Sequence, residues 1–474
     1  MSRYLVTMKK LILLITLVTP IVLTTGSFLY FPALWAEKPR EQRNNDHLPQ
    51  SPDTGTPGGE SIPGGTRNPD EVEGYWSEQV FALEKQWEGL YEKYFDNNFS
   101  SLSLTPDQIA DKLTQLSQQT GKRPAVVWMT STPDYLALYI ITPGKQPMGI
   151  RVPEGNQDAL FNAIKQFHQQ LQSPQSSAYL KPAQDLYKLM ILPIEYHLRS
   201  QNIDTLILCV GPMLRSFPFA ALHDGENFLI ENYGITRIPG FNLTNWDYET
   251  LEDAQILAMG ASEFPNDQPL PGVAAELSTI TPGLWEGVTL LNEAFTLGNL
   301  KEHRQRNPYS IIHLATHAQF NPGNPSHSYI QFSDTRLNLK EMEDLNWSQP
   351  PVDLLVLSAC NTALGDIDAE LGFVGLALQS GVNSAVGSLW RASDLGTLGM
   401  MSEFYWQLKE TSLKAEALRR AQMAMIQGNV RWREGQLETP REDISLTSEA
   451  MRVEGLDLSH PYYWSGFSLV GNPF

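Results

Sequence analysis

The first half of the chain alternates between helical periodicity and two short strands. Apolar residues recur at steps of four and three from Trp76 to Tyr94, which places them on one face of a helix. The run Thr105-Pro-Asp-Gln108 has the form of a capping box with proline at the first helical position, and it predicts a second helix that ends near Gly121. Two strands, 125–129 and 135–142, and two helices, at roughly 157–172 and 182–200, are predicted to follow.

From about residue 204 the pattern changes to short apolar runs that alternate with helical stretches. The runs predict strands at 205–210, 255–260, 310–315, 354–358 and 384–389, and the stretches between them predict helices near 273–280, 295–304, 338–345, 370–380 and 394–408. Fully apolar strands that alternate with helices are typical of a mostly parallel sheet covered on both faces. The sequence therefore predicts an α/β fold whose reactive groups lie beyond the carboxyl ends of the strands.

The N-terminal region has the composition of a membrane segment followed by a tether. Residues 11–36 carry no charge and follow Lys9 and Lys10, which predicts a bilayer-spanning helix with the rest of the chain on the far side from the cytoplasm. A cleaved signal is the alternative, although Leu34 is large for the third position before a cleavage at Ala36. Residues 37–74 are rich in Pro, Gly and charged residues, which indicates a flexible linker.

These patterns predict four segments: a membrane anchor or signal over 1–36, a linker over 37–74, a smaller α+β region over 75–175, and a larger domain over 176–474.

The net charge of −19 over 474 residues argues against a nucleic-acid binder. The two cysteines exclude a disulfide scaffold, and their spacing from the histidines predicts neither a metal site nor a cofactor. Cys209 lies in an apolar run and is expected to be a small buried residue.

Two histidines occur in one apolar run, Ser310-Ile-Ile-His-Leu-Ala-Thr-His317. On a strand, residues four apart share a face but are separated by about 13 Å, so they do not share a metal ion. His313 is therefore expected to be an interior residue. His317 is expected at the carboxyl end of the strand, where a side chain can reach an active-site crevice.

The next apolar run ends in a cysteine, Leu357-Ser-Ala-Cys360, followed by small residues. A thiolate is a nucleophile, and a neighbouring imidazole activates it by taking its proton. A histidine and, 43 residues later, a cysteine at the ends of successive core strands together indicate such a pair. A serine hydrolase is excluded because the chain has no Gly-x-Ser-x-Gly elbow.

The order of these residues is that of the caspases, and the wider sequence resembles the CHAT domain, a branch of the caspase-like clan, in the style of its cyanobacterial members. The resemblance covers about 180–474. It rests on Ile312-His-Leu-Ala-Thr-His317, Leu357-Ser-Ala-Cys-Asn-Thr-Ala-Leu-Gly365, Gly387-Ser-Leu-Trp-Arg-Ala-Ser-Asp394, His460-Pro-Tyr-Tyr-Trp-Ser-Gly-Phe467, Leu270-Pro-Gly-Val-Ala-Ala-Glu-Leu277 and the segment 211–224.

The resemblance implies that His317 is a general base and Cys360 a nucleophile, with the backbone N–H groups of Ala318 and Cys360 as an oxyanion hole. The family usually has glycine after this histidine, where this chain has Ala318. The implied function is a membrane-tethered or exported cysteine endopeptidase that acts through a thioester on a protein or peptide substrate. The alternative is a non-catalytic scaffold or regulatory protein with the same fold, and either implies a regulatory protein partner.

Acidic residues near these motifs suggest a pocket for a basic substrate side chain. Asp353 and Asp394 are the candidates, with Glu403 a third, and a solvated or capping role is the alternative for each.

Overall fold

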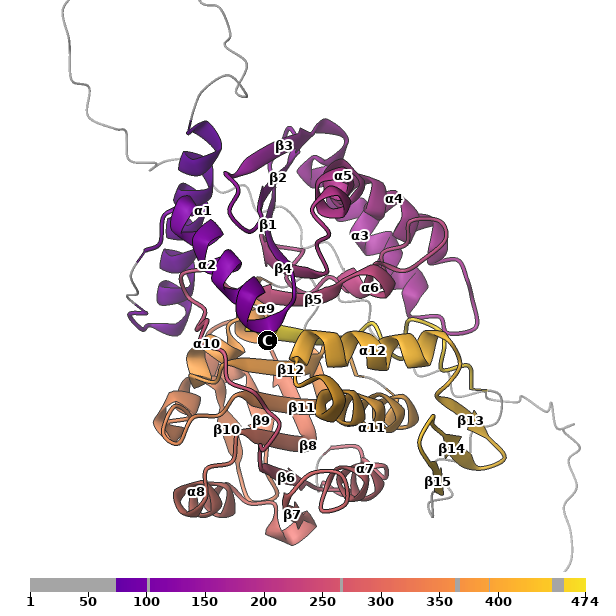
Figure 1. Ribbon diagram of the computed structural model, residues 1–474. Helices are drawn as coiled ribbons and strands as arrows, with labels where there is room; N and C mark the ends of the chain where they lie inside the picture. The colour runs from indigo at the N-terminus through magenta and orange to yellow at the C-terminus, as the bar shows by residue number, and fades with distance from the viewer. Residues whose placement is uncertain (1–73, 100–102, 265–266, 363–366, 392, 446–455) are drawn as a thin grey trace, which may run out of the picture. The chain divides into compact units, whose positions relative to one another are not determined.

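The computed structural model describes residues 74–99, 103–264, 267–362, 367–391, 393–445 and 456–474, all of which belong to one compact unit (Figure 1). The predicted membrane segment at 11–36 lies outside these residues, as does all of the predicted linker except Gly74. Among the described residues, none of the helices combines the length and the hydrophobicity that crossing a bilayer requires.

The N-terminal part builds one half of the central sheet. Thr105 and Gln108 form the predicted capping box, and a left-handed Gly121 ends that helix. The predicted helix at 182–200 is two helices, because Pro193 lacks the N–H that would continue the first one. The elements are α1 (Tyr75–Phe95), α2 (Pro106–Thr120), β1 (Pro124–Ser131), β2 (Leu136–Ile141), β3 (Met148–Val152), α3 (Gln157–Leu171), α4 (Leu180–Met190), α5 (Leu192–Ser200), β4 (Thr205–Val210), α6 (Leu229–Asn232) and β5 (Gly234–Ile238).

The C-terminal part builds the other half of the sheet and adds a small separate one. Its helices are α7 (Val273–Ile280), α8 (Leu297–Arg306), α9 (Ile367–Val374), α10 (Leu376–Ser380), α11 (Asp394–Thr411) and α12 (Lys414–Ile426). Its strands in the main sheet are β6 (Ile256–Gly260), β7 (Gly287–Leu291), β8 (Ile311–Phe320), β9 (Tyr329–Gln331), β10 (Arg336–Asn338), β11 (Leu354–Thr362), β12 (Ser384–Ser388) and β16 (Phe467–Gly471). The strands β13 (Arg431–Arg433), β14 (Gln436–Glu438) and β15 (Asp443–Ser445) form the small sheet.

Within the described residues the main sheet has thirteen strands, in the order β10-β9-β8-β11-β12-β16-β5-β4-β1-β2-β3; β6 pairs with β8, and β7 pairs with β6. The predicted mostly parallel sheet with flanking helices is confirmed, and this arrangement fits a caspase-like fold. β1 pairs with β4 in parallel, so the segments 75–175 and 176–474 contribute strands to one sheet. β16 is antiparallel to β12 and parallel to β5, so the strands of the two halves run in opposite directions.

The strand β8 changes its neighbour partway along its length. Its first part, Ile311 to Ala315, pairs with β6 in parallel, and Ala318 and Gln319 pair with β9 in antiparallel fashion. On its other side β8 pairs with β11 throughout, apart from an irregularity between Leu357 and Ala359. The residues Thr316 and His317 thus lie where one neighbouring strand has ended and the next has not begun.

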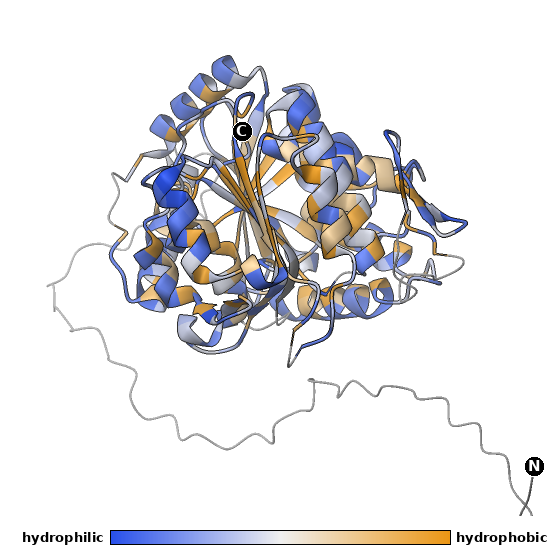
Figure 2. Ribbon diagram, turned by 90° about the horizontal axis from the view of Figure 1, so that it is seen from below, coloured by the Kyte–Doolittle hydropathy of each residue, from blue (hydrophilic) through white to orange (hydrophobic). Residues whose placement is uncertain are grey.

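Helices cover both faces of the sheet, and Figure 2 shows the strands as an apolar layer between helices with polar outer surfaces. In β8, His313 contacts Glu276 of α7 and Tyr405 of α11, whereas Phe320 packs against Phe373 of α9. The helices α7 and α11 therefore cover β8 around His313, and α9 covers it around Phe320.

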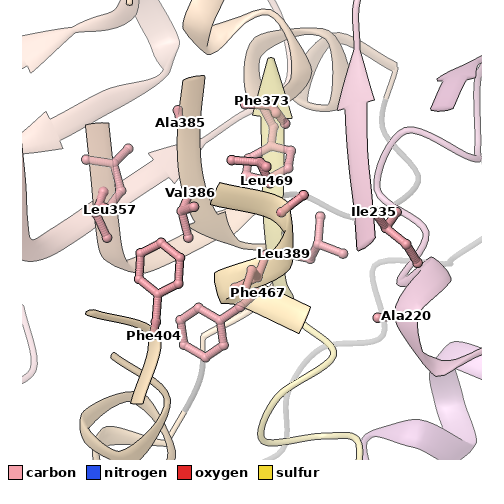
Figure 3. Close-up of a cluster of buried hydrophobic side chains, with 14 of the residues drawn as sticks. Ala220, Ile235, Leu357, Phe373, Ala385, Val386, Leu389, Phe404, Phe467 and Leu469 are labelled. Atoms are coloured by element: carbon pink, nitrogen blue, oxygen red, sulfur yellow. The ribbon is translucent and has the colours of Figure 1, made fainter. Parts of the chain in front are cut away.

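Buried side chains from adjacent strands fill the junction between the two halves of the sheet. Leu357 of β11, Val386 of β12, Leu469 of β16 and Ile235 of β5 are buried and follow one another from strand to strand across the junction, and Phe404 of α11 is also buried there (Figure 3). Since β16 contributes side chains to this cluster and backbone pairs on both edges, the junction depends on it for both packing and hydrogen bonds.

Replacing Phe467, which is 2% exposed at the start of β16, with alanine is expected to destabilise the fold by about 3–5 kcal/mol, because it leaves a cavity at the junction. The matched control is Phe81→Ala, since Phe81 is 39% exposed and its loss should cost less than about 1 kcal/mol. The measurement is the urea midpoint of each variant. Equal midpoints for the two variants would contradict the role given to β16.

Candidate functional site

His317 lies in β8 at the point where its neighbouring strand changes from β6 to β9. The sequence predicted this residue at the end of the strand, but β8 continues three residues further, to Phe320, because β9 and β11 pair with the extension. The pairing with β6 does stop at Ala315, so one edge of the strand opens just before His317.

The imidazole of His317 is oriented by a backbone carbonyl. Its Nε2 lies 2.7 Å from the carbonyl oxygen of Gln268, in the segment between β6 and α7. A carbonyl only accepts hydrogen bonds, so Nε2 carries the proton and Nδ1 is the atom that can accept another. The ring of Phe264 lies 4.8 Å from the imidazole, centroid to centroid, and limits its rotation.

Burial keeps this imidazole neutral. His317 is 8% exposed, and desolvation of the charged form is the main cause that lowers its pKa below the usual value of about 6.5. The Gln268 carbonyl acts in the opposite direction, the Arg391 guanidinium lowers the pKa further, and Asp267 raises it. The result is an uncharged ring at neutral pH, which is the form that accepts a proton.

Cys360 lies in the neighbouring strand, one residue beyond the position opposite His317. In the register of β8 with β11, Ala359 is opposite His317 and Cys360 is opposite Ala318. Neighbouring strands are about 4.8 Å apart, so the backbones of two residues separated by 43 positions in sequence lie side by side. The side chain of Cys360 lies outside the described part of the structure.

Ala318 occupies extended backbone rather than a turn. It is 1% exposed and pairs with Ile330 of β9 on one side and Cys360 of β11 on the other. Its φ is not among the positive values of the chain, so alanine in place of the usual glycine causes no backbone strain here. Because strands flank it on both sides, its N–H faces one of them.

Asp394 lies at the start of a helix beside the segment that precedes α7. It is the first residue of α11, and its carboxylate accepts a hydrogen bond from the backbone N–H of Gly272. Burial raises the pKa of Asp394 to about 6; the Gly272 bond and the Arg391 guanidinium lower it, and Glu276 raises it. Since Arg391 influences both Asp394 and His317, these groups share one neighbourhood.

Asp353 lies elsewhere. It precedes β11, so the seven residues to Cys360 span about 23 Å at roughly 3.3 Å per residue. Its carboxylate accepts a hydrogen bond of 2.8 Å from Asn383, which precedes β12. Glu403, within α11, accepts a bond of 2.6 Å from Gln407, one helical turn further on. Asp394 and His317 thus share the influence of Arg391, whereas Asp353 lies at the other end of the strand from Cys360.

Two residues that the sequence analysis placed in the interior are there. Nε2 of His313 lies 3.0 Å from Oε1 of Glu276, and its Nδ1 lies 3.0 Å from the Tyr405 hydroxyl. Cys209 is fully buried, its thiol faces a carboxylate oxygen of Glu84 at 3.8 Å, and burial is the main cause that raises its pKa well above the ordinary value. A buried, protonated thiol is a poor nucleophile.

Three contributors to the site were not predicted: Phe264, Gln268 and Arg391. Gln268 acts through its backbone carbonyl, which any residue type provides, so its side chain carries no signal. Within the described residues, no group of three or more His, Cys, Asp or Glu side chains has the arrangement of a metal site.

Comparison with known proteins identifies the larger part of the chain. The family model of the CHAT domain matches residues 180–472. None of the curated proteins compared with the chain matched it.

Among solved structures, the Saccharomyces cerevisiae separase–securin complex aligns with a TM-score of 0.47 at 9% identity, over 85% of this chain and 34% of the other, so this chain spans about a third of that protein. The Arg-specific cysteine proteinase gingipain R (RGPB) aligns with a TM-score of 0.38 at 12% identity, over 64% of this chain and 68% of the other. The complex of Porphyromonas gingivalis RgpB pro- and mature domains aligns with a TM-score of 0.37 at 12% identity, covering 67% and 77%.

The environment of His317 predicts that its imidazole titrates below pH 6.5, because burial disfavours the charged ring. The measurement is the pH dependence of the histidine signals in the NMR spectrum, with His317 assigned by the signal that His317→Gln removes. Protonation then disfavours the folded state, so this group costs stability as the pH falls from 6.5 through the lowered pKa. A midpoint at or above 6.5 would contradict the assignment of a buried neutral ring.

Proposed function

The chain belongs to the CHAT domain family, and from this membership we propose that it is a caspase-like cysteine endopeptidase in which His317 and Cys360 form the catalytic pair. The observation that carries the proposal is the β8–β11 register, in which Cys360 is opposite Ala318, the residue that follows His317. The hydrogen bond from Nε2 of His317 to Gln268 supports it, because it leaves Nδ1 as the basic atom.

In the proposed reaction, Nδ1 of His317 takes the proton of the Cys360 thiol, and the sulfur attacks the carbonyl carbon of the scissile peptide bond. The imidazolium then gives its proton to the leaving amine, and the C–N bond breaks to leave a thioester. Water, deprotonated by the same imidazole, hydrolyses the thioester and restores the thiol. The lowered pKa of His317 keeps the ring in the base form at neutral pH.

The backbone N–H groups of Ala318 and Cys360 are proposed to stabilise the oxyanion. Each belongs to a strand, and Ala318 has strands on both sides, so its N–H becomes available only if the pairing of β8 or β11 loosens there. We propose that substrate binding loosens the pairing of β8 with β11 at Ala318 and Cys360. The ladder is already interrupted just before these residues, by the irregularity between Leu357 and Ala359.

The substrate is proposed to be a protein or peptide, and Asp394 is proposed to contribute to a pocket for a basic side chain. The Arg391 guanidinium, which acts on both Asp394 and His317, supports this role, and the pKa of about 6 leaves Asp394 mostly charged at neutral pH. Asp353 does not join this pocket, because the length of β11 separates it from Cys360.

A non-catalytic scaffold with a regulatory protein partner is the second candidate, and one observation favours it. The pairing of β8 with β11 continues past Cys360, to Thr362 and Phe320. The backbones of His317 and Cys360 therefore both lie within paired strands. A peptide probe that reacts covalently with an active thiol distinguishes the two, because a scaffold would leave Cys360 unlabelled.

The catalytic pair predicts that Cys360→Ala and His317→Ala each lower the rate of peptide cleavage by roughly 10⁴- to 10⁶-fold without unfolding the protein, since the two residues act as one unit. The measurement is hydrolysis of a peptide library by purified protein. The control is Cys209→Ser, which keeps a donor toward Glu84 and should cleave at the wild-type rate. Cleavage by the Cys360→Ala variant would refute the assignment.

We also propose that residues 11–36 anchor the protein, with residues 37–474 on the extracytoplasmic side; a secreted or periplasmic protein after signal cleavage is the alternative. The uncharged stretch and the preceding lysines support the proposal. Carbonate-washed membranes are expected to retain the full-length chain, and external protease should digest its globular part in spheroplasts. A soluble chain that begins near Glu37 would show a cleaved signal, and full protection from protease would show the opposite orientation.

A further inference from the structure

We propose that Glu370 is a positioning residue for the proposed active site: it holds the start of α9, seven residues after Cys360, against the turn that follows β4. The inference rests on the proposed peptidase function. Glu370 lies ten residues after Cys360 and in the first turn of α9, and it is fully buried. A buried carboxylate is costly unless it is well bonded, so its contacts indicate what it does.

The carboxylate of Glu370 binds a single turn through both oxygens. Oε1 accepts a hydrogen bond of 2.6 Å from the Ser216 hydroxyl, and Oε2 accepts one of 3.1 Å from the backbone N–H of Met213. Met213 has a φ of +70°, a conformation that residues other than glycine rarely adopt. The two hydrogen bonds to Glu370 therefore support the conformation of this turn. The same bonds connect α9 to the N-terminal half of the sheet.

The charges around Glu370 strengthen this connection. The Arg237 guanidinium, on β5, is fully desolvated, which lowers its pKa to about 9, and the negative charge of Glu370 opposes that decrease. Hydrogen bonds to a charged acceptor are shorter and stronger than those between neutral groups. The substitution Glu370→Gln would keep one oxygen as an acceptor. Its NH₂ group would replace the other oxygen and would face a donor, either the Ser216 hydroxyl or the Met213 N–H.

A second carboxylate in the same turn binds the strand of the proposed base. Asp368 accepts a hydrogen bond of 3.2 Å from the backbone N–H of Gly323, which follows β8, the strand of His317. The first turn of α9 is thus bonded to the continuation of β8 by Asp368 and to the turn after β4 by Glu370. These three hydrogen bonds hold the start of α9, seven residues after Cys360, relative to the continuation of the His317 strand.

The test compares Glu370→Gln and Ser216→Ala with wild type and with a matched control, Glu410→Gln, whose carboxylate is exposed on α11. Misplacing a reacting group by about 1 Å costs on the order of 100-fold, so Glu370→Gln is expected to lower kcat by up to that factor, with a much smaller change in KM. Ser216→Ala, which removes one of the two bonds, should lower kcat less. Glu410→Gln should behave like wild type.

Two readouts do not require turnover. The rate at which iodoacetamide modifies Cys360, followed by mass spectrometry of the peptide that contains it, should change in Glu370→Gln and in Ser216→Ala. Amide exchange over residues 367–374 should become faster in both. Cys209 does not interfere, because it is fully buried and its pKa is raised.

Unchanged alkylation and exchange in both variants would overturn the positioning role, whether or not the protein cleaves peptides. A lower melting temperature with unchanged kcat and alkylation would show a structural role alone and would also overturn it. If wild type cleaves nothing while both readouts change as expected, the proposed peptidase function fails and the positioning of the Cys360 segment stands. If Glu370→Gln does not fold, Ser216→Ala decides the matter.

Discussion

The insertion of β16 between β12 and β5 is the constraint on which the whole sheet depends. Its backbone pairs with one half of the sheet in antiparallel and with the other in parallel fashion. Buried polar groups fix its position: Arg237 donates to the Ser468 hydroxyl and to the Phe217 carbonyl, and the Thr236 hydroxyl donates to the Gly471 carbonyl at 2.8 Å. These bonds make the register of β16 specific, because a slip by one residue would take the Ser468 hydroxyl away from the desolvated Arg237 guanidinium.

Sequence patterns predicted most of the strands that are buried on both faces, since these are uninterrupted apolar runs. They did not predict β5, whose run Thr236 and Arg237 interrupt, β7, whose residues are partly exposed at the edge of the sheet, or β16, which includes Ser468. They also ended the strand of His317 too early. Beyond Ala315 the residues Thr316 and His317 are polar, and the strand continues only because β9 and β11 pair with it. That pairing is tertiary information and leaves no local signal.

In the candidate site, too, some residues could be predicted from the sequence and others could not. The histidine and the cysteine could be predicted because both follow apolar runs and their order is that of a known family. The carbonyl of Gln268 could not, because every residue has one. The contrast between Asp353 and Asp394 was in principle visible: Asp353 precedes its strand, Asp394 follows the next one, and in a parallel array only the second position lies on the reactive side. Glu370 gave no signal, because its importance comes from a turn more than 150 positions earlier in the chain.

The position of β16 in chain order has a consequence for biosynthesis. Every other strand of the sheet leaves the ribosome before residues 467–471 do, so β12 and β5 wait with open edges until the last one arrives. Exposed edges of this kind are templates for association between nascent chains. Closure also joins residues that are more than 230 positions apart, such as Thr236 and Gly471, and contacts so distant in sequence form slowly. A cell that makes this protein therefore has to protect an almost complete sheet for the time that the final segment takes to emerge.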